Sequence, residues 1–92
     1  MYYVYILLSD KDKQLYIGYA TDLKKRVKKH QDGFVRATKY RLPIKLIYYE
    51  CYPYESDAKR REKYLKGGKG RNELKIQLHD CLVKNEYRHL PV

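Results

Sequence analysis

Two short segments near the start of the chain have the composition of β-strands. Residues 2–8 read YYVYILL and residues 15–20 read LYIGYA, and both are rich in the β-branched and aromatic side chains that strands favour. The connection between them, SDKDKQ, is polar and short enough for a β-hairpin. We therefore expect the fold to be organised around an antiparallel hairpin at its N-terminal end.

The rest of the chain alternates between helix and strand signals. Thr21 or Asp22 can cap a helix that continues to about Gln31, because both side chains accept hydrogen bonds from free backbone N–H groups. The further expected elements are a strand over 44–52, a helix from Glu55 or Ser56 to about Lys66, a break at the glycines of 67–70, and an amphipathic helix over about 71–83. The i, i+4, i+8 spacing in the last helix predicts that it buries Leu74, Leu78 and Leu82. This β-β-α-β-α-α order predicts an α+β fold, in which three helices pack on a small sheet.

The length and the cysteine content narrow the class of protein. Ninety-two residues make one domain with a modest core, which we place at residues 1–83, and residues 84–92 are expected to form a C-terminal tail. The chain lacks the run of about 18 apolar residues that a membrane span requires. Cys51 and Cys81 have neither CxxC spacing nor the pattern of a disulfide framework, which is typical of a cytoplasmic protein.

The charge of the chain indicates a polyanionic partner. It carries 21 Lys and Arg against 11 Asp and Glu, a net charge of +10. Residues 24–45 hold nine basic side chains and one acid, and residues 59–75 hold eight basic side chains and two acids. Nucleic acid is favoured over a membrane surface, because no stretch combines these lysines with a broad apolar face. Charge alone does not distinguish an enzyme from a domain that only binds nucleic acid.

Two tyrosines and a glycine in the expected hairpin stand out among the twelve tyrosines of the chain. Alternation along the strands places Tyr5 on one face of the first strand, and Tyr16 and Gly18 on one face of the second. If the hairpin brings these faces together, two phenols lie side by side next to the glycine. They form either a stabilising aromatic pair or part of a site, since a glycine within a strand often marks the close approach of a ligand or another backbone.

One arginine and one histidine in the first expected helix flank its apolar stripe. Leu23 and Val27 define the stripe, and Arg26 and His30 lie beside it, where their side chains can turn toward the tyrosines. The lysines around them occupy outer positions of the helix. Taken singly, each of the two residues is more often a surface residue than a catalytic one.

A carboxylate interrupts the apolar stripe of the second expected helix. Glu62 lies between Ala58 and Leu65 with the spacing of a face that packs on the core, and a buried carboxylate requires a cation. The first alternative is a salt bridge with one of the neighbouring arginines, Arg26, Arg60 or Arg61. The second is a site for one Mg²⁺ or Mn²⁺ ion, since magnesium uses one or two carboxylates together with water and phosphate.

These residues together resemble the motif of the GIY-YIG nuclease family. The first part reads YVY at residues 3–5, YIG follows at residues 16–18, and the next expected helix carries Arg26 and His30. Glu62 ends a segment that resembles the downstream part of the family pattern. The likeness covers nearly the whole chain and is greatest to the small stand-alone bacterial members, which resemble the nuclease domain of excinuclease C.

The resemblance implies a fold and a reaction. Family members have an active site on one face of a three-stranded antiparallel sheet, and they hydrolyse phosphodiester bonds with metal-activated water. Carried over by position, the catalytic residues, the glycine and the metal ligand are Tyr5, Tyr16, Arg26, His30, Gly18 and Glu62. Glu62 would hold the cation, Arg26 would stabilise charge on the phosphate, and one of the tyrosines would orient or deprotonate the water. His30 would hydrogen-bond a tyrosine or the phosphate.

The chain departs from the family pattern at several positions. The first motif is YVY rather than GIY, which keeps the tyrosine. Tyr19 stands where some members have a lysine, so that Lys25 would supply the charge. Asn72 is the candidate for an asparagine that several members carry after the glutamate. The last two departures bear on activity more than on fold.

The predicted function is therefore a metal-dependent endonuclease acting on DNA in repair or recombination. The alternative is a non-catalytic nucleic-acid-binding module on the same fold. In either case the phosphate backbone would be contacted by basic side chains, namely Lys25, Arg36, Lys39, Arg41, Lys69 and Arg71. We expect no separate targeting domain in so short a chain, so specificity would come from a protein partner or from the shape of the DNA.

Overall fold

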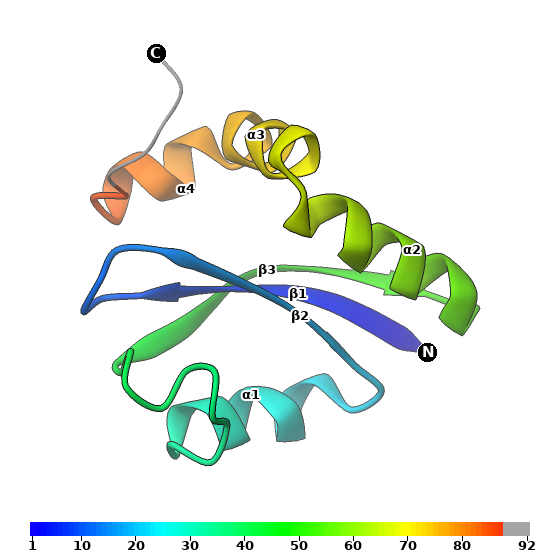
Figure 1. The fold of residues 1–92 in the computed structure, drawn as a ribbon, viewed down its shortest axis with the longest axis horizontal. Helices are drawn as coiled ribbons and strands as arrows, with labels where there is room; N and C mark the ends of the chain where they lie inside the picture. The colour runs from blue at the N-terminus through cyan, green and yellow to red at the C-terminus, as the bar shows by residue number, and fades with distance from the viewer. Residues whose placement is uncertain (88–92) are drawn as a thin grey trace.

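Figure 1 shows the computed structural model of the chain, which describes residues 1–87. Its strands are β1 (Tyr2–Ser9), β2 (Leu15–Ala20) and β3 (Ile44–Tyr52), and its helices are α1 (Leu23–Gln31), α2 (Glu55–Lys66), α3 (Gly68–Gln77) and α4 (His79–Lys84). The strands form one antiparallel sheet with helices on both faces. The predicted α+β class and the three-stranded antiparallel sheet are confirmed.

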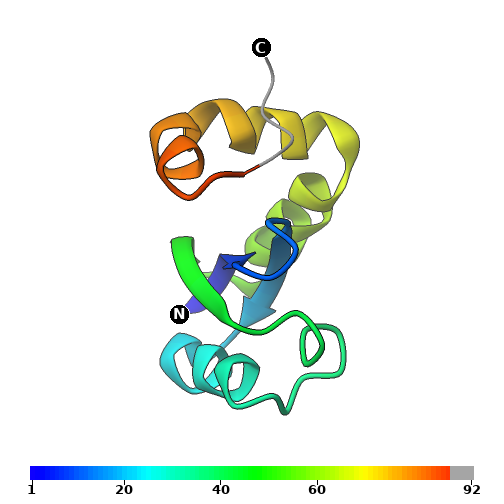
Figure 2. The same ribbon diagram turned by 90° about the vertical axis from the view of Figure 1, so that its left-hand side faces the viewer.

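β1 is the central strand of the sheet, in the order β2-β1-β3. Figure 1 shows α1 on one face and α2, α3 and α4 on the other, and the turned view in Figure 2 agrees. Because both of its faces are covered, β1 is buried from Val4 to Leu8 and reads as an almost continuous apolar run. The alternating side chains of β1 therefore pack against the helices on both faces of the sheet.

The two faces of β1 build separate hydrophobic cores. Its even-numbered side chains, from Val4 to Leu8, pack against α2, α3 and α4. Its odd-numbered side chains Tyr5 and Leu7 belong to a second core, which includes Val27 of α1. Since alternate side chains of a strand point to opposite faces, this register directs Tyr5 toward α1.

The last predicted helix is divided in the structure. The region over 71–83 is split into α3 and α4 at Leu78, whose backbone (φ −101°, ψ 23°) leaves the α-helical region, so four helices are found among residues 1–87 where three were predicted. The apolar spacing was informative all the same, because Leu74 and Leu82 are both fully buried. Among residues 1–87, no helix is long and apolar enough to cross a membrane.

The glycine segment between α2 and α3 is mostly helical. The predicted break at 67–70 is confined to Gly67, whose extended backbone (φ −78°, ψ 165°) ends α2, and α3 begins at Gly68. Gly70 lies against the end of α2, and a Cβ there would overlap the backbone carbonyl of Tyr64. This glycine therefore lets two helices approach each other closely, rather than breaking a helix.

The packed part of the chain extends beyond residue 83. α4 ends at Lys84, and Tyr87 is buried in the core that α2, α3 and α4 cover. The division between a domain at 1–83 and a tail at 84–92 stays a prediction, although Tyr87 contributes its ring to that core. The rest of the predicted tail, 88–92, lies outside the described residues.

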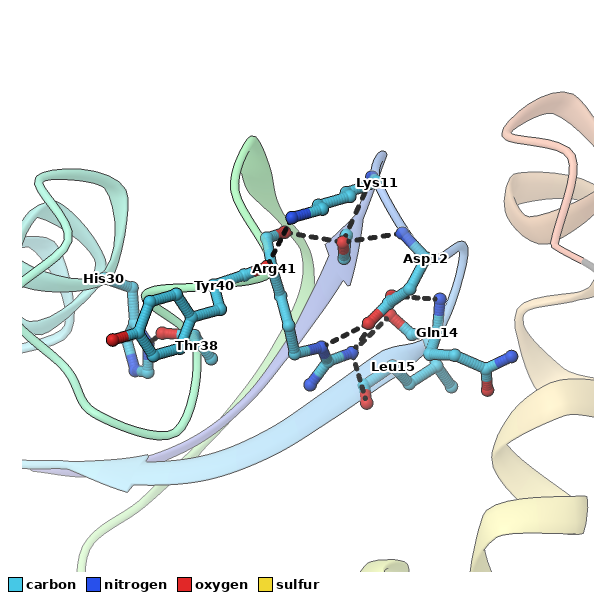
Figure 3. A network of polar contacts seen from close by, with 9 residues as sticks. Lys11, Asp12, Gln14, Leu15, His30, Thr38, Tyr40 and Arg41 are labelled. Atoms are coloured by element: carbon cyan, nitrogen blue, oxygen red, sulfur yellow. Dashed lines mark hydrogen bonds and ion pairs between the residues drawn. The ribbon is translucent and has the colours of Figure 1, made fainter.

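The turn between β1 and β2 is bound to the segment between α1 and β3, as Figure 3 shows. The Arg41 guanidinium donates to Asp12 Oδ2 at 2.6 Å and to two backbone carbonyls at the start of β2. The Ser9 hydroxyl donates to the Arg41 carbonyl at 2.6 Å. These contacts hold residues 32–43 against the hairpin, although that segment consists of turns rather than a helix or a strand.

Candidate active site

The two motif tyrosines lie side by side on the face of the sheet that α1 covers. In the β1–β2 ladder Tyr5 pairs with Gly18 and Leu7 pairs with Tyr16, so both phenols project from one face. Their ring centroids are 6.3 Å apart. The phenols therefore meet diagonally across the hairpin.

Gly18 makes room for the ring of Tyr5. A Cβ at this position would overlap Cζ and the hydroxyl oxygen of that ring. The sequence suggested close approach by a ligand or another backbone, and the structure corrects this interpretation: the approaching group is the tyrosine itself. Gly18 is thus required to seat the phenol.

His30 is fully buried and links Tyr5 to the segment after α1. Its Nε2 lies 2.7 Å from the Tyr5 hydroxyl, and its Nδ1 lies 2.7 Å from Oγ1 of Thr38. Burial and, after it, the charge of Arg26 lower the pKa of His30 from 6.5 to about 4, so the ring is neutral at pH 7. A neutral ring donates at one nitrogen and accepts at the other, and its two contacts use both.

Arg26 fixes the direction of these hydrogen bonds. Its Nε donates to the Tyr5 hydroxyl oxygen at 3.4 Å, and because a guanidinium cannot accept, the Tyr5 proton is directed at His30 Nε2. The His30 proton is therefore assigned to Nδ1, which donates to Thr38. The hydrogen bond to Tyr5, together with the nearby Tyr16, raises the pKa of Arg26 and keeps it charged.

The two tyrosines differ in burial. Tyr5 is fully buried, whereas Tyr16 is partly exposed and its ring lies 4.9 Å from that of His30. Burial raises the pKa of Tyr5 in spite of the hydrogen bond from Arg26, which lowers it. In this state Tyr5 is thus a neutral phenol that holds its neighbours in place.

Glu62 lies on α2, the helix that begins after β3. Its side chain is 17% exposed, and its Oε2 lies 3.0 Å from Nζ of Lys66, one helical turn further on. The pKa of Tyr5 is raised first by burial and also by the negative charge of Glu62, which places the carboxylate within electrostatic range of the phenol. The charge of Glu62 thus acts on the phenol at a distance, although α2 packs on the opposite face of the sheet.

The arginine partner predicted for Glu62 is wrong. Arg60 forms its ion pair with Asp57, and Arg61 forms a bidentate pair with Glu50 of β3 at 2.9 and 3.2 Å. Lys66 was missed because an i, i+4 lysine is so common on a helix that it carries little information. A flexible, half-exposed lysine leaves the carboxylate easier to reach than a buried arginine pair would.

The chemistry of Glu62 fits one hydrated divalent cation. Within residues 1–87 no three His, Cys, Asp or Glu side chains are grouped as a metal site. Mg²⁺ does not need such a group, since it keeps several of its water ligands and binds one or two carboxylates together with substrate phosphate oxygens. The hard, partly exposed carboxylate of Glu62 has the donor type for that arrangement.

A polar hollow of about 420 Å³ opens beside these residues, where β2 ends and α1 begins. Its walls carry three cationic side chains, and the one carboxylate, Asp22, is engaged as the N-cap of α1 through the backbone N–H of Lys25. The lining residues are Tyr19, Ala20, Thr21, Asp22, Lys25, Arg26 and Lys29. The hollow suits an anion such as a phosphate group.

A lysine from α2 also reaches this region. Nζ of Lys59 lies 4.1 Å from the ring centroid of Tyr19, the position at which the family resemblance implied a lysine. The Tyr19 hydroxyl donates to Glu55 at 2.6 Å, and this bond raises the pKa of Tyr19 to about 12. Sequence reasoning assigned the charge to Lys25 and missed Lys59, although its i, i+3 spacing from Glu62 places both on one side of α2.

The predicted nucleic-acid contacts lie in different parts of the molecule. Lys25 lines the hollow, and Arg36 and Lys39 are exposed on the segment between α1 and β3. Lys69 and Arg71 lie on α3, on the opposite side of the sheet from α1 (Figure 1). The remaining residue, Arg41, is committed to Asp12 and to backbone carbonyls, so it is a structural tether rather than an exposed cation.

Comparison with known protein families shows which family this chain belongs to. A family model described as the GIY-YIG catalytic domain matches residues 1–75. The chain belongs to the GIY-YIG family. The matched region includes Tyr5, Tyr16, Arg26 and His30, which the fold brings into contact.

Small bacterial proteins of the UPF0213 group are similar to this chain over most of their length. A UPF0213 protein of Staphylococcus saprophyticus is 40% identical over 76 residues, which is 82% of this chain and 92% of that protein. A UPF0213 protein of Clostridium perfringens is 43% identical over 67 residues, 72% of this chain and 71% of the relative. The solution NMR structure of a UPF0213 protein from Bacillus halodurans is 35% identical, covers 85% of each chain and superposes with a TM-score of 0.53.

Proposed function

We propose that this protein is an endonuclease that hydrolyses phosphodiester bonds of DNA with one bound Mg²⁺ or Mn²⁺ ion. The observation that carries the proposal is the connected group of Tyr5, His30 and Arg26, with Tyr16 in contact and Glu62 within electrostatic range. Membership of a family whose domain is described as catalytic supports it. Binding alone would not require a buried histidine hydrogen-bonded to a buried phenol.

Arg26 is proposed to bind the phosphate and stabilise the charge that develops on it. The side chain borders the cationic hollow, and Tyr5 holds its Nε–H group. The two terminal amino groups of a guanidinium held in this way can donate in parallel to two phosphate oxygens. Such preorganised donors are most effective where water is partly excluded, as it is at this half-buried site.

Tyr16 is proposed to orient the attacking water. It is partly exposed, whereas Tyr5 is fully buried and its hydroxyl already contacts Arg26 and His30. Tyr5 and His30 are proposed to position Arg26. His30 is neutral, so its Nε2 can accept a hydrogen bond from Tyr5 and leave the phenol oxygen free to accept from Arg26.

Glu62 is proposed to hold the divalent ion. When bound, the ion would polarise the phosphoryl group and stabilise the leaving oxygen. Lys25 and Lys29 of the hollow would position the phosphate backbone, and Lys59 adds positive charge beside Tyr19. The ion pair with Lys66 would have to open when the ion binds, which the half-exposed lysine permits.

A nicking assay on defined DNA tests the proposal. Purified protein should nick branched or flapped DNA with Mg²⁺ or Mn²⁺, and EDTA should abolish the reaction. Glu62→Gln and Arg26→Lys should each lower the rate by about 100-fold or more. Glu62→Gln removes the proposed metal ligand, and Arg26→Lys removes the paired guanidinium donors proposed to bind the phosphate. Both substitutions keep the size of the side chain and should leave the thermal unfolding midpoint within a few degrees.

Matched variants guard against contamination and indirect effects. Glu73→Gln removes an exposed carboxylate of α3, and Arg60→Lys alters an exposed arginine of α2, so both should nick at the wild-type rate. Equal nicking by wild type, Glu62→Gln and Arg26→Lys would contradict the proposal, because the activity would then come from another protein.

A non-catalytic nucleic-acid-binding module is the second candidate. The observation that favours it is that Tyr5 is buried with a raised pKa and that Glu62 already has a cationic partner in Lys66. This alternative predicts salt-sensitive DNA binding and no cleavage with any divalent ion. The same assay separates the two candidates.

The proposal extends to a setting in DNA repair or recombination in the cytoplasm, with a protein partner for targeting. The two free cysteines, Cys51 and Cys81, support a reducing compartment such as the cytoplasm. Co-purification from cells with DNA damage, compared with undamaged cells, is the direct test of the partner.

A further inference from the structure

The segment between α1 and β3 presents two aromatic side chains to solvent. Phe34 is 80% exposed and Tyr40 is 75% exposed, the highest values among the large hydrophobic residues described. Phe34 is also the single phenylalanine of the chain. Single exposed apolar residues are common on proteins, so exposure by itself assigns no role to them.

The two rings are exposed on a segment that is held in one conformation. Val35 and Thr38 point inward and are buried, and the backbone N–H groups of Thr38 and Lys39 both donate to the Val35 carbonyl. The Lys11 ammonium donates to the Tyr40 carbonyl at 3.0 Å, beside the Arg41 contacts seen in Figure 3. A binding surface that is already ordered loses little conformational entropy when a ligand is bound.

This segment adjoins the proposed active site. Thr38 is hydrogen-bonded to His30, and Tyr40 follows two residues later, so its Cα lies no more than about 7 Å along the chain from that of Thr38. On the other side, the backbone N–H of Phe34 donates to the Lys29 carbonyl, and Lys29 lines the hollow. A DNA strand bound at the hollow would therefore pass close to this segment.

Positive charge accompanies the two rings. Arg36 and Lys39 are exposed between them, and Nζ of Lys39 lies 4.9 Å from the ring centroid of Tyr40. Exposed aromatic rings interspersed with cations are the arrangement with which proteins bind unpaired strands: the cations follow the phosphates and the rings stack on bases. Paired bases in a duplex offer no free face to such rings.

We propose that Phe34 and Tyr40 stack on unpaired nucleobases, so that the protein prefers DNA with a single-stranded segment next to the scissile bond. This inference rests on the proposed function for its substrate but not on cleavage for its test. It assigns Phe34 and Tyr40 to selection of the substrate rather than to its hydrolysis.

Binding in EDTA tests the inference without cleavage. Fluorescence anisotropy should compare a blunt duplex with the same duplex carrying a single-stranded flap. Phe34→Ala and Tyr40→Ala should each weaken binding of the flapped DNA by about tenfold, the size of one base-stacking contact, and change duplex binding by less than about twofold. Tyr54→Ala removes another exposed ring, 69% exposed at the start of α2, and is the matched control.

A spectroscopic signal distinguishes stacking from a structural role. The chain has no tryptophan, so Phe34→Trp introduces a single reporter. Flapped DNA should quench its fluorescence, and the blunt duplex should not. Wild-type binding of both DNAs by Phe34→Ala and Tyr40→Ala would overturn the inference, as would an unquenched tryptophan in the bound state.

The outcomes also separate this inference from the proposed function. Loss of preference for the flap in variants that still nick DNA supports the inference and leaves the nuclease intact. Nicking by all variants with no preference for unpaired bases overturns the inference alone. Binding of a protein at Phe34 and Tyr40 with no effect of their loss on flapped DNA would equally overturn it.

Discussion

At the scale of single residues, His30 determines how the site is held together. Its lowered pKa keeps the ring neutral, and a neutral ring can both accept from Tyr5 and donate to Thr38. A protonated ring would have two donors, and the hydrogen bond from Tyr5 would lose its acceptor. The burial of His30 thus fixes which group donates in each hydrogen bond of the series: Arg26 to Tyr5, Tyr5 to His30, and His30 to Thr38.

The pH dependence of stability should report this burial. Unfolding exposes His30 and returns its pKa from about 4 to about 6.5, so the unfolded chain binds an extra proton between these pH values. The contribution of the buried, neutral His30 to the free energy of unfolding is therefore complete above about pH 6.5 and is lost as pH falls toward 4. Thermal unfolding midpoints should fall more steeply over this interval for wild type than for His30→Gln. The exposed His79→Gln should keep the wild-type slope, and equal slopes for all three proteins would refute the assignment.

Thr38 should matter to activity although no motif contains it. Thr38→Val keeps the shape of the side chain but removes the acceptor for Nδ1 of His30, which leaves a buried N–H group unpaired at a cost of about 1–3 kcal/mol. The ring can avoid this cost by changing tautomer, which would misdirect the Tyr5 proton. We expect nicking by Thr38→Val to fall about tenfold or more and its pH profile to shift.

Thr38→Ser retains a hydroxyl and is the matched control. Its rate and pH profile should stay near those of wild type. A purely structural role would instead lower the stability of Thr38→Val without moving the pH profile of the remaining activity.

At the scale of elements, the junction of α2 and α3 depends on one of its three glycines. A Cβ on Gly70 would overlap the Tyr64 carbonyl, whereas a Cβ on Gly68 would meet nothing within 4 Å. Gly70→Ala should lower the free energy of unfolding by about 1–3 kcal/mol, because backbone must move. Gly68→Ala should be neutral or raise it by up to about 1 kcal/mol, since alanine restricts the unfolded chain. Urea denaturation of both variants measures the difference, and equal effects would show that the close approach is not what Gly70 provides.

Local patterns predicted the elements well and their junctions poorly. Strand composition located β1, β2 and β3, and the spacing of Leu74 and Leu82 identified the buried side of the last helices. The interruption at Leu78 and the helical conformation of Gly68 accompany the close contact of α3 with α2, where Gly70 meets Tyr64. Such contacts join residues that are not neighbours in the repeating pattern of either helix, so sequence spacing does not reveal them.

The candidate site was predictable where one element carries the signal. Strand alternation and helix spacing singled out Tyr5, Tyr16, Arg26 and His30 as candidates, and the family resemblance implied that they belong to one active site. Thr38 was not predictable, because its contact with His30 depends on how the segment after α1 folds back. The same holds for Arg41, whose role as a tether requires the hairpin turn to be placed beside it.

At the scale of the whole molecule, the two basic stretches of the chain lie on different sides of the sheet. One includes α1 and the segment that follows it, and the other includes α2 and α3 (Figure 2). A straight duplex lying along the α1 side would contact the first stretch and, from the second, Lys59 beside Tyr19, but not the α3 side chains Lys69 and Arg71. We expect the α1 side to carry the DNA, because the cationic hollow is formed there.

Charge reversal on each side tests this arrangement. Lys25→Glu combined with Lys29→Glu should weaken DNA binding by about tenfold or more and reduce its dependence on salt, since each lost phosphate contact lowers the salt slope by about 0.9. Lys69→Glu combined with Arg71→Glu changes the net charge equally and should have a smaller effect. Binding isotherms at several salt concentrations measure both, and equal losses would indicate that DNA wraps around both sides.

The seating of Tyr5 against Gly18 has a consequence for how such proteins diverge. The phenol occupies the volume that any side chain at residue 18 would need, so the two positions cannot vary independently. A lineage that gains a methyl group at residue 18 must shrink residue 5 to keep its sheet, and it thereby discards the hydroxyl. The glycine would thus mark descendants able to carry out the proposed cleavage, since a descendant without it can retain the architecture and a cationic exterior while lacking the Tyr5 hydroxyl.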